Sequence, residues 1–577
     1  MAAPASRLVA GVPDDRGRSL VSRPIPKVVP RGAVTEYTRG DRHNIRPCIP
    51  SAKNCLVSTL VGWRARYGLI VAFGILNAIT YSALLPLWEG FDEPFHFAYV
   101  QHLGTEQRLP QLGTTTLSAE VLQALQLAPA SHVVRSNIPT LMTYDAFYRL
   151  PQHQQEDRLQ HLDPQLRHQP SDFYNYEAHQ APLAYMILAP LETALQRVSI
   201  TDRVLALRLF AGTVSVALTA ASALWLASEL GLYGIWVSAL LLCTFSHQMF
   251  YATVAHVAND WLSVPTFVAW NAALCRYVRT GTPLSAATAG LLTSIGLLSK
   301  AYFLAVLPVL FLIFMWRVVR DRRYSSFIAG LVSLGVSIPW YCRNVLLYNN
   351  VSGTVEAANG IGVSAVIANL LEVPWLSSIA YMARASVWTG NNSFNTFSET
   401  TINMHLALLG IMFVMYFRYR LGKTAWGRDA VVLGSTVVFM AALAYATVAS
   451  YIFTNGRSAG ASPWYMQPLL VPLLTLSLIG ASSSGKLGKT LAAGFTALNV
   501  YILFVSYSAK LFPAYNGYLE GKVTIASILT WYMEVFSRDA VSLSLASSSF
   551  VGAMIGVTTV LAIYLCVQVC LPLMRSQ

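Results

Sequence analysis

The chain has 577 residues, of which 54% are hydrophobic and only 12% are charged, and its mean hydropathy is +0.48. Charged residues supply about a quarter of a typical soluble domain, so this composition excludes an ordinary soluble protein. Apolar runs recur along nearly the whole chain and leave no long polar stretch for a separate domain. We therefore expect a single membrane domain, residues 67–577, with polar loops.

The first 66 residues form a basic segment that contributes much of the net charge of +13. They hold twelve Lys and Arg against four acids, together with many Pro and Gly. Such a segment cannot bury a core and predicts a disordered tail, which its charge would hold at the anionic cytoplasmic surface. Charge that sets topology explains it better than nucleic-acid binding does, so we expect no nucleic-acid partner. The seven cysteines show neither a disulfide framework nor zinc spacing.

Twelve apolar runs are long enough to be considered as membrane spans. The first, Tyr67–Leu87, carries no charge and can cross a hydrocarbon core of about 30 Å. With the basic tail inside, this span exits outward. The others lie near residues 204–228, 233–252, 261–279, 284–299, 301–316, 327–345, 401–417, 430–450, 464–481, 489–507 and 547–571. The expected fold is an all-α polytopic membrane protein with about twelve transmembrane helices.

The segment 181–196 is apolar but short, and Pro182 and Pro190 interrupt it. If it does not cross, the later clusters of Arg and Lys, such as those at 317–323 and 418–423, all fall on the inner side. If it crosses, every one of these clusters moves outside. The positive-inside rule therefore favours a juxtamembrane or re-entrant segment at the outer interface.

The same rule places three large loops on the outer face, at residues 88–203, 346–400 and 508–546. The first of them carries seven of the eleven histidines. Its stretch Phe95–Leu103 alternates aromatic and polar groups, as a helix lying on the membrane surface would. We expect the chemistry of this protein in these loops, on the outer face of an inner or plasma membrane.

Adjacent carboxylates, Asp92 and Glu93, follow the first span directly. At the border of the membrane an Asp is partly desolvated, which raises its affinity for a proton and suits it to act as a general base. The alternative is a solvated pair that caps a helix beginning at Pro94, since Pro is common at the first helical position.

Two further groups could line a site. His179 and Tyr185 belong to a polar cluster that runs into the short apolar segment, and His179 could meet a phosphate. An interfacial belt of His and Tyr would also explain this cluster. Asp260 follows Asn259 between two apolar runs and could converge with Asp92, although a helix cap explains it as well.

Isolated cations stand at the outer ends of later spans: Lys300, Arg343 and Arg457. A cation kept on the wrong side of the membrane suggests an anionic partner, and a lipid phosphate is the natural candidate. Arg can grip phosphate through two hydrogen bonds, whereas Lys acts as a point charge. The alternative is snorkelling to lipid headgroups or pairing with an acid. Asp92 and His96 would share a helical face, so a divalent cation is an option, but no spacing here assigns a metal site.

The order of these motifs resembles the GT-C glycosyltransferase superfamily, in the branch of protein O-mannosyltransferases and aminoarabinose-transferase-like enzymes. The resemblance begins with Asp92–His96 (DEPFH), Arg108–Pro110 (RLP) and His179–Tyr185 (HQAPLAY). It continues through Leu207–Leu209, Asn259–Asp260, Leu298–Lys300 and Trp340–Asn344. It covers residues 67–350 well and is looser beyond them, where only Gly456–Arg457 and Pro463–Pro468 match, loosely, the family's Arg-Tyr ahead of a Pro-containing span.

The resemblance implies a GT-C-type fold and transfer of one sugar, with inversion, from a polyprenyl-phosphate donor to a lipid, glycan or protein acceptor on the periplasmic or lumenal face. It implies Asp92 as the base, with Glu93 orienting Asp92 or the acceptor. The remaining predicted residues would bind the donor phosphate or line the cavity: His96, His179, Tyr185, Asp260, Lys300, Arg343 and Arg457. No cofactor is certain.

Two rival functions fit a polytopic chain. A transporter or lipid flippase would show an internal repeat and charges near the bilayer midplane, and the sequence shows neither, because its polar residues gather at one face. A noncatalytic scaffold with a binding loop is favoured only if Asp92, Asp260 and Lys300 lie far apart.

Overall fold

The computed structural model describes residues 52–160, 164–322, 324–388, 397–423, 427–458, 460–518, 525–537 and 541–575. The chain divides into two compact units, Met1–Val57 and Ser58–Gln577, and the second contains nearly all of the described residues. Most of the predicted basic tail lies outside the described residues. Helix α1 nevertheless begins at Ala52, inside the stretch expected to be disordered, because residues 52–66 contain no Pro.

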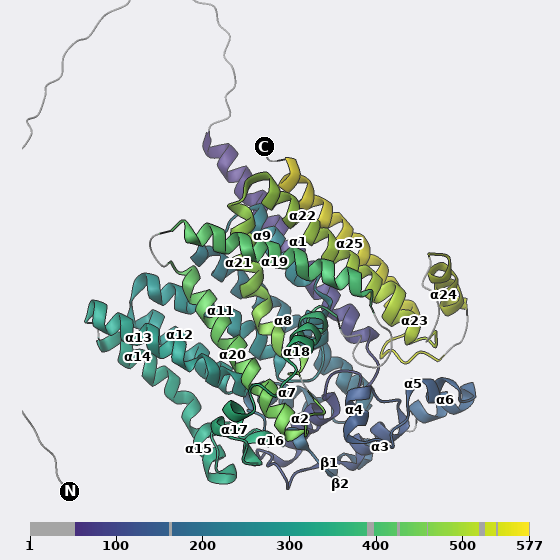
Figure 1. Cartoon of the computed structure of the whole chain (residues 1–577). Helices are drawn as coiled ribbons and strands as arrows, with labels where there is room; N and C mark the ends of the chain where they lie inside the picture. The colour runs from purple at the N-terminus through teal and green to yellow at the C-terminus, as the bar shows by residue number, and fades with distance from the viewer. Residues whose placement is uncertain are drawn as a thin grey trace, which may run out of the picture. The chain divides into compact units, whose positions relative to one another are not determined.

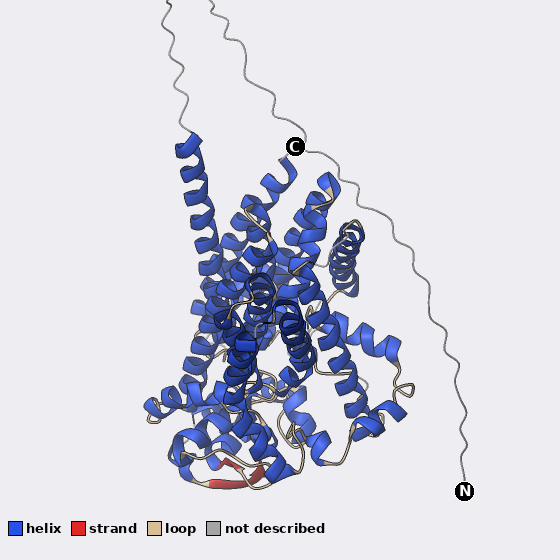
Figure 2. Ribbon diagram, turned by 90° about the vertical axis from the view of Figure 1, so that its left-hand side faces the viewer, coloured by secondary structure: helices blue, strands red, loops and turns tan. Residues whose placement is uncertain are grey.

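A bundle of helices, some of them only about one turn long, dominates the described part of the chain (Figures 1 and 2). They are α1 (Ala52–Leu84), α8 (Ile200–Leu230), α9 (Ile235–Phe245), α10 (Gln248–Val254), α11 (Asp260–Thr280), α12 (Pro283–Leu297), η3 (Ala301–Val306), α13 (Leu307–Asp321), α14 (Tyr324–Leu334), η4 (Gly335–Ser337), α15 (Ile338–Tyr348), α19 (Glu399–Leu421), α20 (Asp429–Phe453), η6 (Pro463–Leu469), α21 (Leu470–Ser482), α22 (Gly485–Val505), the π-helix η7 (Ser506–Leu511), α23 (Phe512–Ala514) and α25 (Ser548–Arg575).

Local signals fix where these helices begin and end. At the start of α8 the Ser199 side chain accepts a hydrogen bond from the backbone N–H of Asp202, and Gly231 ends the helix in the left-handed conformation at φ 76°. The thirty-one residues between them are mostly apolar and reach about 45 Å, more than a bilayer core requires.

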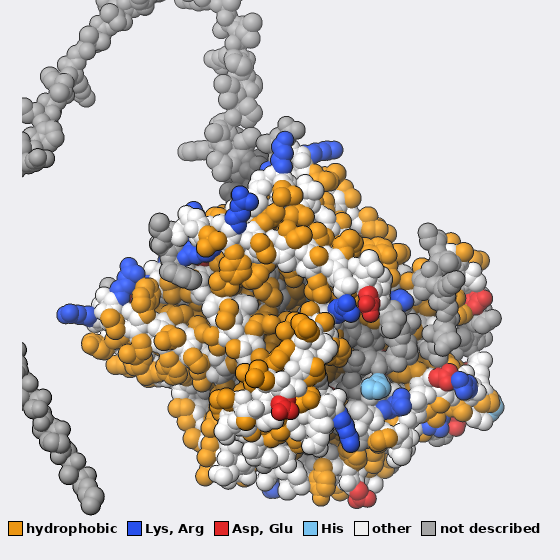
Figure 3. All heavy atoms as spheres, in the orientation of Figure 1, with side chains coloured by type: hydrophobic (Ala, Val, Ile, Leu, Met, Phe, Trp, Pro, Cys, Tyr) orange, Lys and Arg blue, Asp and Glu red, His pale blue; other side chains and the backbone are white. Residues whose placement is uncertain are grey.

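Nine described helices are long and apolar enough to cross a membrane, and the bent pair α9 and α10 makes a tenth. This pair is broken by 60° at Ser246 and His247. The prediction of a polytopic all-α membrane protein is confirmed, but the count of twelve is not. Two of the predicted runs are not among these spans. One forms α11, which is not apolar enough to cross a membrane, and the other forms α12, which has only 15 residues. On the face drawn in Figure 3, apolar side chains cover most of the middle, with a few charged side chains at its right and others toward the top and bottom.

The loop 88–203 folds into a small layer of its own. It contains α2 (Glu93–Glu106), α3 (Ala119–Leu127), α4 (His132–Asn137), α5 (Tyr144–Tyr148), α6 (Gln152–Gln160), η1 (Pro164–His168), η2 (Tyr176–His179), α7 (Leu183–Ala194) and the antiparallel strands β1 (Thr116–Ser118) and β2 (Pro170–Tyr174). Helices α16 (Val355–Ala358) and α17 (Val363–Ala368) lie at the same end (Figure 1), while α18 (Trp375–Ala385) and α24 (Ile525–Ser537) complete the described elements.

Two details of this layer bear on the sequence predictions. Helix α7 has 12 residues, too few to span a bilayer, as expected for a juxtamembrane segment. Helix α2 was expected to lie on the surface, but its residues Glu93–Gln101 are buried, because α7 and the neighbouring loop elements pack over it. A buried ionic network holds the layer together: Arg203 bonds both Glu120 and Glu192, and Arg167 bonds Glu192.

Candidate functional site

Asp92 occupies the position before helix α2, with φ 55° in the left-handed region that Asp tolerates better than most residues. Its side chain does not cap the helix, so the simple capping explanation does not account for it. Instead, Oδ1 accepts a hydrogen bond from the hydroxyl of Tyr176. The partly buried carboxyl is thereby aimed at η2 and away from its own helix.

Glu93, its neighbour, is fully buried and has a different task. Arg208 on α8 donates from Nε to Oε1 at 2.8 Å and pairs with Oε2 as well, and the backbone N–H of Val257 donates to Oε1 at 3.0 Å. The same guanidinium donates to the carbonyls of Leu85 and Pro86 at the end of α1. Burial is the largest effect and raises the pKa of Glu93, but the charge and hydrogen bonds of Arg208, with His256 and the Val257 N–H, together outweigh it and hold the pKa below its usual range. Glu93 is a buried ionic tie between α1, α2 and α8.

A second acid, Glu177, lies on the short helix η2. The Asn175 side chain accepts from the Glu177 N–H at 3.0 Å and donates to the Phe95 carbonyl at 2.9 Å, which fastens η2 to α2. Glu177 Oε2 lies 4.0 Å from Nδ1 of His96 and has no hydrogen-bond partner. The hydroxyl of Tyr185 shares a hydrogen bond of 2.8 Å with the same His96 nitrogen.

A third acid and the single Lys of the site form a buried pair. Lys300, after α12, donates from Nζ to Oδ2 of Asp260 at 2.5 Å, and its ammonium lies 4.8 Å from the ring centroid of Tyr465. Asp260 Oδ1 is buried without a partner. Asn259 donates to the Gln180 side chain at 3.0 Å, which joins this pair to the segment that carries Glu177.

The charges of these groups act on one another. Burial is the largest cause that raises the pKa of Asp92 to about 7, and the charge of Glu177 adds to it, while the Tyr176 hydrogen bond and Lys300 oppose it. Burial likewise raises the pKa of Glu177 to about 7. Three carboxyls share one lysine, and ionising all of them would leave excess negative charge in a buried space. Asp92 and Glu177 therefore titrate as a pair near neutral pH.

The histidines of the cluster are uncharged. Burial lowers the pKa of His96 and of His179, and Lys300 adds to the effect on His96. His179 contacts the Tyr176 carbonyl through Nδ1 at 2.7 Å, which fixes the proton on that nitrogen, because a carbonyl can only accept. A neutral His179 positions η2, so it offers no positive charge to a phosphate.

An apolar groove of about 860 Å³ adjoins this cluster along helices α12 to α15. Its lining comprises Leu297, Leu304, Leu307, Phe311, Leu331, Leu334, Gly335, Ser337, Ile338, Tyr341, Cys342, Val345, Leu346 and Val351. Leu297 lies three residues before Lys300, and the Tyr341 hydroxyl donates to its carbonyl at 2.9 Å. One lining residue of the groove therefore stands close in the chain to the lysine of the cluster.

The structure brings most of the predicted residues together. Asp92, His96, His179, Tyr185, Asp260 and Lys300 belong to one connected cluster. Arg343 on α15 lies at its margin: its Nη2 donates to the Pro110 carbonyl at 2.7 Å, its charge acts on Tyr99, and Nη1 is buried without a partner. Tyr99 in turn stacks on Tyr185 at 4.1 Å. Arg457 is exposed, and among the described residues its side chain makes no hydrogen bond or ion pair.

Four residues of the cluster were not among the predicted site residues: Tyr176, Glu177, His256 and Tyr465. Tyr176 and Glu177 stand within three residues of His179, so the motif itself could have indicated them. His256 carries no sequence signal. A methyl group on Gly90 would lie 2.8 Å from its Cβ, so only glycine permits this approach. Within the described ranges, no group of three or more His, Cys, Asp or Glu side chains is arranged to hold a metal ion.

Comparison with known proteins finds no matching family model and no matching curated protein. The chain is similar to ArnT from Cupriavidus metallidurans bound to undecaprenyl phosphate, with 10% identity and a TM-score of 0.44, over 91% of this chain and 77% of that one. It is also similar to the arabinosyltransferase EmbB from Mycobacterium smegmatis, with 12% identity and a TM-score of 0.40. That match covers 93% of this chain and 44% of EmbB, so this chain spans less than half of EmbB. From its own helices, the chain is an all-α polytopic membrane protein with a buried acid cluster beside an apolar groove.

Proposed function

We propose that this protein is a membrane glycosyltransferase of the GT-C type, which moves a sugar from a polyprenyl-phosphate donor to an acceptor on the outer face of the membrane. The observation that carries the proposal is a carboxyl of raised pKa, Asp92, which the charge of the buried Lys300 acts on, together with an apolar groove whose lining includes Leu297, three residues before that lysine. The motif order of the sequence supports the same assignment, and Asp92 is central to both arguments.

Asp92 is the proposed general base. A carboxyl with a pKa of about 7 is ionised in a large fraction of molecules at neutral pH and still holds a proton well once it has taken one. As the acceptor hydroxyl forms a bond to the anomeric carbon, its proton passes to Asp92. The bond from that carbon to the phosphate oxygen breaks, and the lipid phosphate leaves with the electron pair. Attack opposite the leaving group inverts the anomeric centre.

The leaving phosphate gains negative charge as the bond breaks, so a nearby cation attracts it more strongly in the transition state than in the bound donor. Arg343 has one buried guanidinium nitrogen, Nη1, without a partner, and it lies on the helix that lines the groove. Lys300 is buried near Asp92 but already pairs with Asp260. In this proposal Arg343 grips the phosphate and Lys300 supplies a fixed positive charge nearby. The groove, whose lining is almost entirely apolar, accepts the first part of the prenyl chain.

The roles of the other predicted residues follow from their contacts. Glu93 holds the end of α1 against α2 and so positions Asp92, rather than meeting substrate. His96 lies next to Glu177, and Tyr185 shares a hydrogen bond with the His96 nitrogen that faces that acid. Among the described residues, no hydrogen bond or ion pair joins the Arg457 side chain to the cluster, and we assign it no part in the reaction.

The experiment is a transfer assay with purified protein and a polyprenyl-phosphate sugar, with release of the lipid phosphate followed by mass spectrometry. The sugar and acceptor are found first by comparing glycolipids, envelope polysaccharides and glycoproteins of cells with and without the chain. Asp92→Asn should lower turnover by about 10²- to 10⁴-fold, the usual contribution of a general base. Asp172→Asn, an exposed acid in the same loop, is the matched control and should retain full turnover. Full activity of Asp92→Asn would refute the mechanism, and no release of lipid phosphate under any condition would refute the function.

A further inference from the structure

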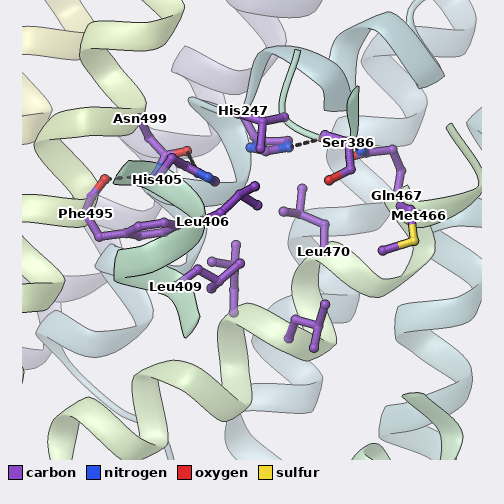
Figure 4. Close-up of a pocket in the computed structure, with 13 residues that line it drawn as sticks. His247, Ser386, His405, Leu406, Leu409, Met466, Gln467, Leu470, Phe495 and Asn499 are labelled. Atoms are coloured by element: carbon purple, nitrogen blue, oxygen red, sulfur yellow. Dashed lines mark hydrogen bonds between the residues drawn. The ribbon is translucent and has the colours of Figure 1, made fainter. Parts of the chain in front are cut away.

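A second polar pocket lies away from the Asp92 cluster, among the membrane helices α19, α21 and α22. It is a cavity of about 50 Å³ lined by His247, Ser386, Val387, His405, Leu406, Leu409, Met466, Gln467, Leu470, Leu473, Leu474, Phe495 and Asn499. Polar groups surround one end, and leucines form the other (Figure 4). The proposed glycosyl transfer uses none of these residues.

The hydrogen bonds of His405 fix its protonation. Asn499 donates from Nδ2 to the Phe495 carbonyl at 2.9 Å, so its Oδ1 faces His405 Nε2 at 3.2 Å as an acceptor. The proton of His405 therefore lies on Nε2, and the lone pair of Nδ1 is free. That nitrogen is buried without a partner, in a side chain that is 2% exposed.

Gln467 presents a second free acceptor. Its Nε2 donates to the Ser386 carbonyl at 2.9 Å, which sets the orientation of the amide. Its Oε1 is consequently an acceptor, and it is buried without a partner in a side chain that is 2% exposed. His247 donates from Nε2 to the same carbonyl at 3.0 Å and closes this end of the pocket. Two buried acceptors without a donor cost free energy unless a ligand supplies one.

The charge of the lining limits what that ligand is. None of the described lining residues is Asp, Glu, Lys or Arg, so an ammonium group or a metal ion would enter the membrane interior without a counter-charge. A hydroxyl donates a hydrogen bond without carrying charge. A cavity of about 50 Å³ accommodates only a few water-sized groups, which suits the head of such a molecule.

The other end of the pocket is apolar. Leu406, Leu409 and Leu470 lie below the polar end in Figure 4. Figure 3 shows the apolar face of the molecule hollowed near its centre, in the region that Figure 1 labels α18 to α21. We propose that this pocket binds the diol end of a long-chain 1,2-diol that enters from the membrane, with one hydroxyl donating to His405 Nδ1 and the other to Gln467 Oε1.

The test is photolabelling of the purified full chain with 1,2-hexadecanediol that carries a diazirine in its chain. Labelled peptides should map to residues 405–409, 466–474 or 495–499, and free 1,2-hexadecanediol should displace the probe. The 2-O-methyl ether of the diol has a similar shape but one donor fewer, and it should compete about threefold to tenfold more weakly, as expected for one lost hydrogen bond. Equal competition by the ether, or protection by zinc alone, would overturn the proposal.

Single variants distinguish loss of one hydrogen-bond acceptor from a general loss of structure. His405→Phe and Gln467→Met each remove one acceptor while keeping an apolar volume, and each should weaken labelling by a similar factor. Thr496→Val changes a buried polar group of α22 outside the pocket lining and should label like the wild type. Unchanged labelling in both pocket variants would refute the assignment. If one variant does not fold, the other still decides.

Discussion

Replacement of Glu177 by Gln tests the electrostatic origin of the proposed base. The step from the ordinary pKa of 3.8 to about 7 in Asp92 corresponds to roughly 4 kcal/mol in favour of its neutral form. Burial supplies the largest part, and the negative charge of Glu177 is the second cause. Glu177→Gln removes that charge and keeps the shape, so the pKa of Asp92 should fall while burial keeps it above 3.8.

The pH dependence of turnover measures this change. A base must be ionised, so the wild-type rate should rise with pH through about 7. At pH 6 only about a tenth of Asp92 is ionised, so Glu177→Gln can raise the rate there by at most about tenfold. Above about pH 8 Asp92 is ionised in both proteins, and the two rates should agree.

The control for this assay is Glu372→Gln, which removes the charge of an exposed acid and should leave the profile unchanged. If the turnover of Glu177→Gln still rises with pH around pH 7, as in the wild type, the two carboxyls do not interact. If the rise in turnover moves to higher pH in Glu177→Gln, Glu177 does not raise the pKa of Asp92, because loss of a neighbouring negative charge can only favour ionisation.

Three further changes test other contacts. Arg208→Met leaves Glu93 charged and buried without its partner and should destabilise the fold by about 3–5 kcal/mol, seen as a lower midpoint of thermal unfolding, and an unchanged midpoint would contradict the buried pair. Arg343→Lys should lower kcat more than it raises KM for the lipid donor, because it removes the free Nη1 that would stabilise the departing phosphate in the transition state, and an unchanged kcat would exclude that role. Gly90→Ala should lower kcat while the protein still folds, because the new methyl group meets His256, and full activity would show that this contact is easily relieved.

Much of the fold was accessible from the sequence, because hydrophobic length alone marks helices that cross a membrane. The count failed where two runs depart from that rule: α11 carries too many polar residues, and α12 is short. The burial of α2 could not be predicted either, since it depends on how the rest of the outer loop packs over it.

The site was predictable to the extent that motifs carried it. Asp92, Asp260 and Lys300 stand in recognisable positions, and they do converge. The sequence could not show that Asp92 and Glu93 have different roles, because this depends on which of the two carboxyls faces the guanidinium of Arg208 on another helix. Arg457 matched a pattern, but that pattern does not encode the turn that leaves it exposed.

The left-handed backbone of Asp92 decides which variants can be interpreted. At φ 55° a β-branched or bulky side chain strains the main chain, so its loss of activity would report a distorted turn as much as a missing carboxyl. Asn and Gly tolerate that geometry. A saturation screen at this position would therefore rank most substitutions by backbone cost, and only these two isolate the acid itself.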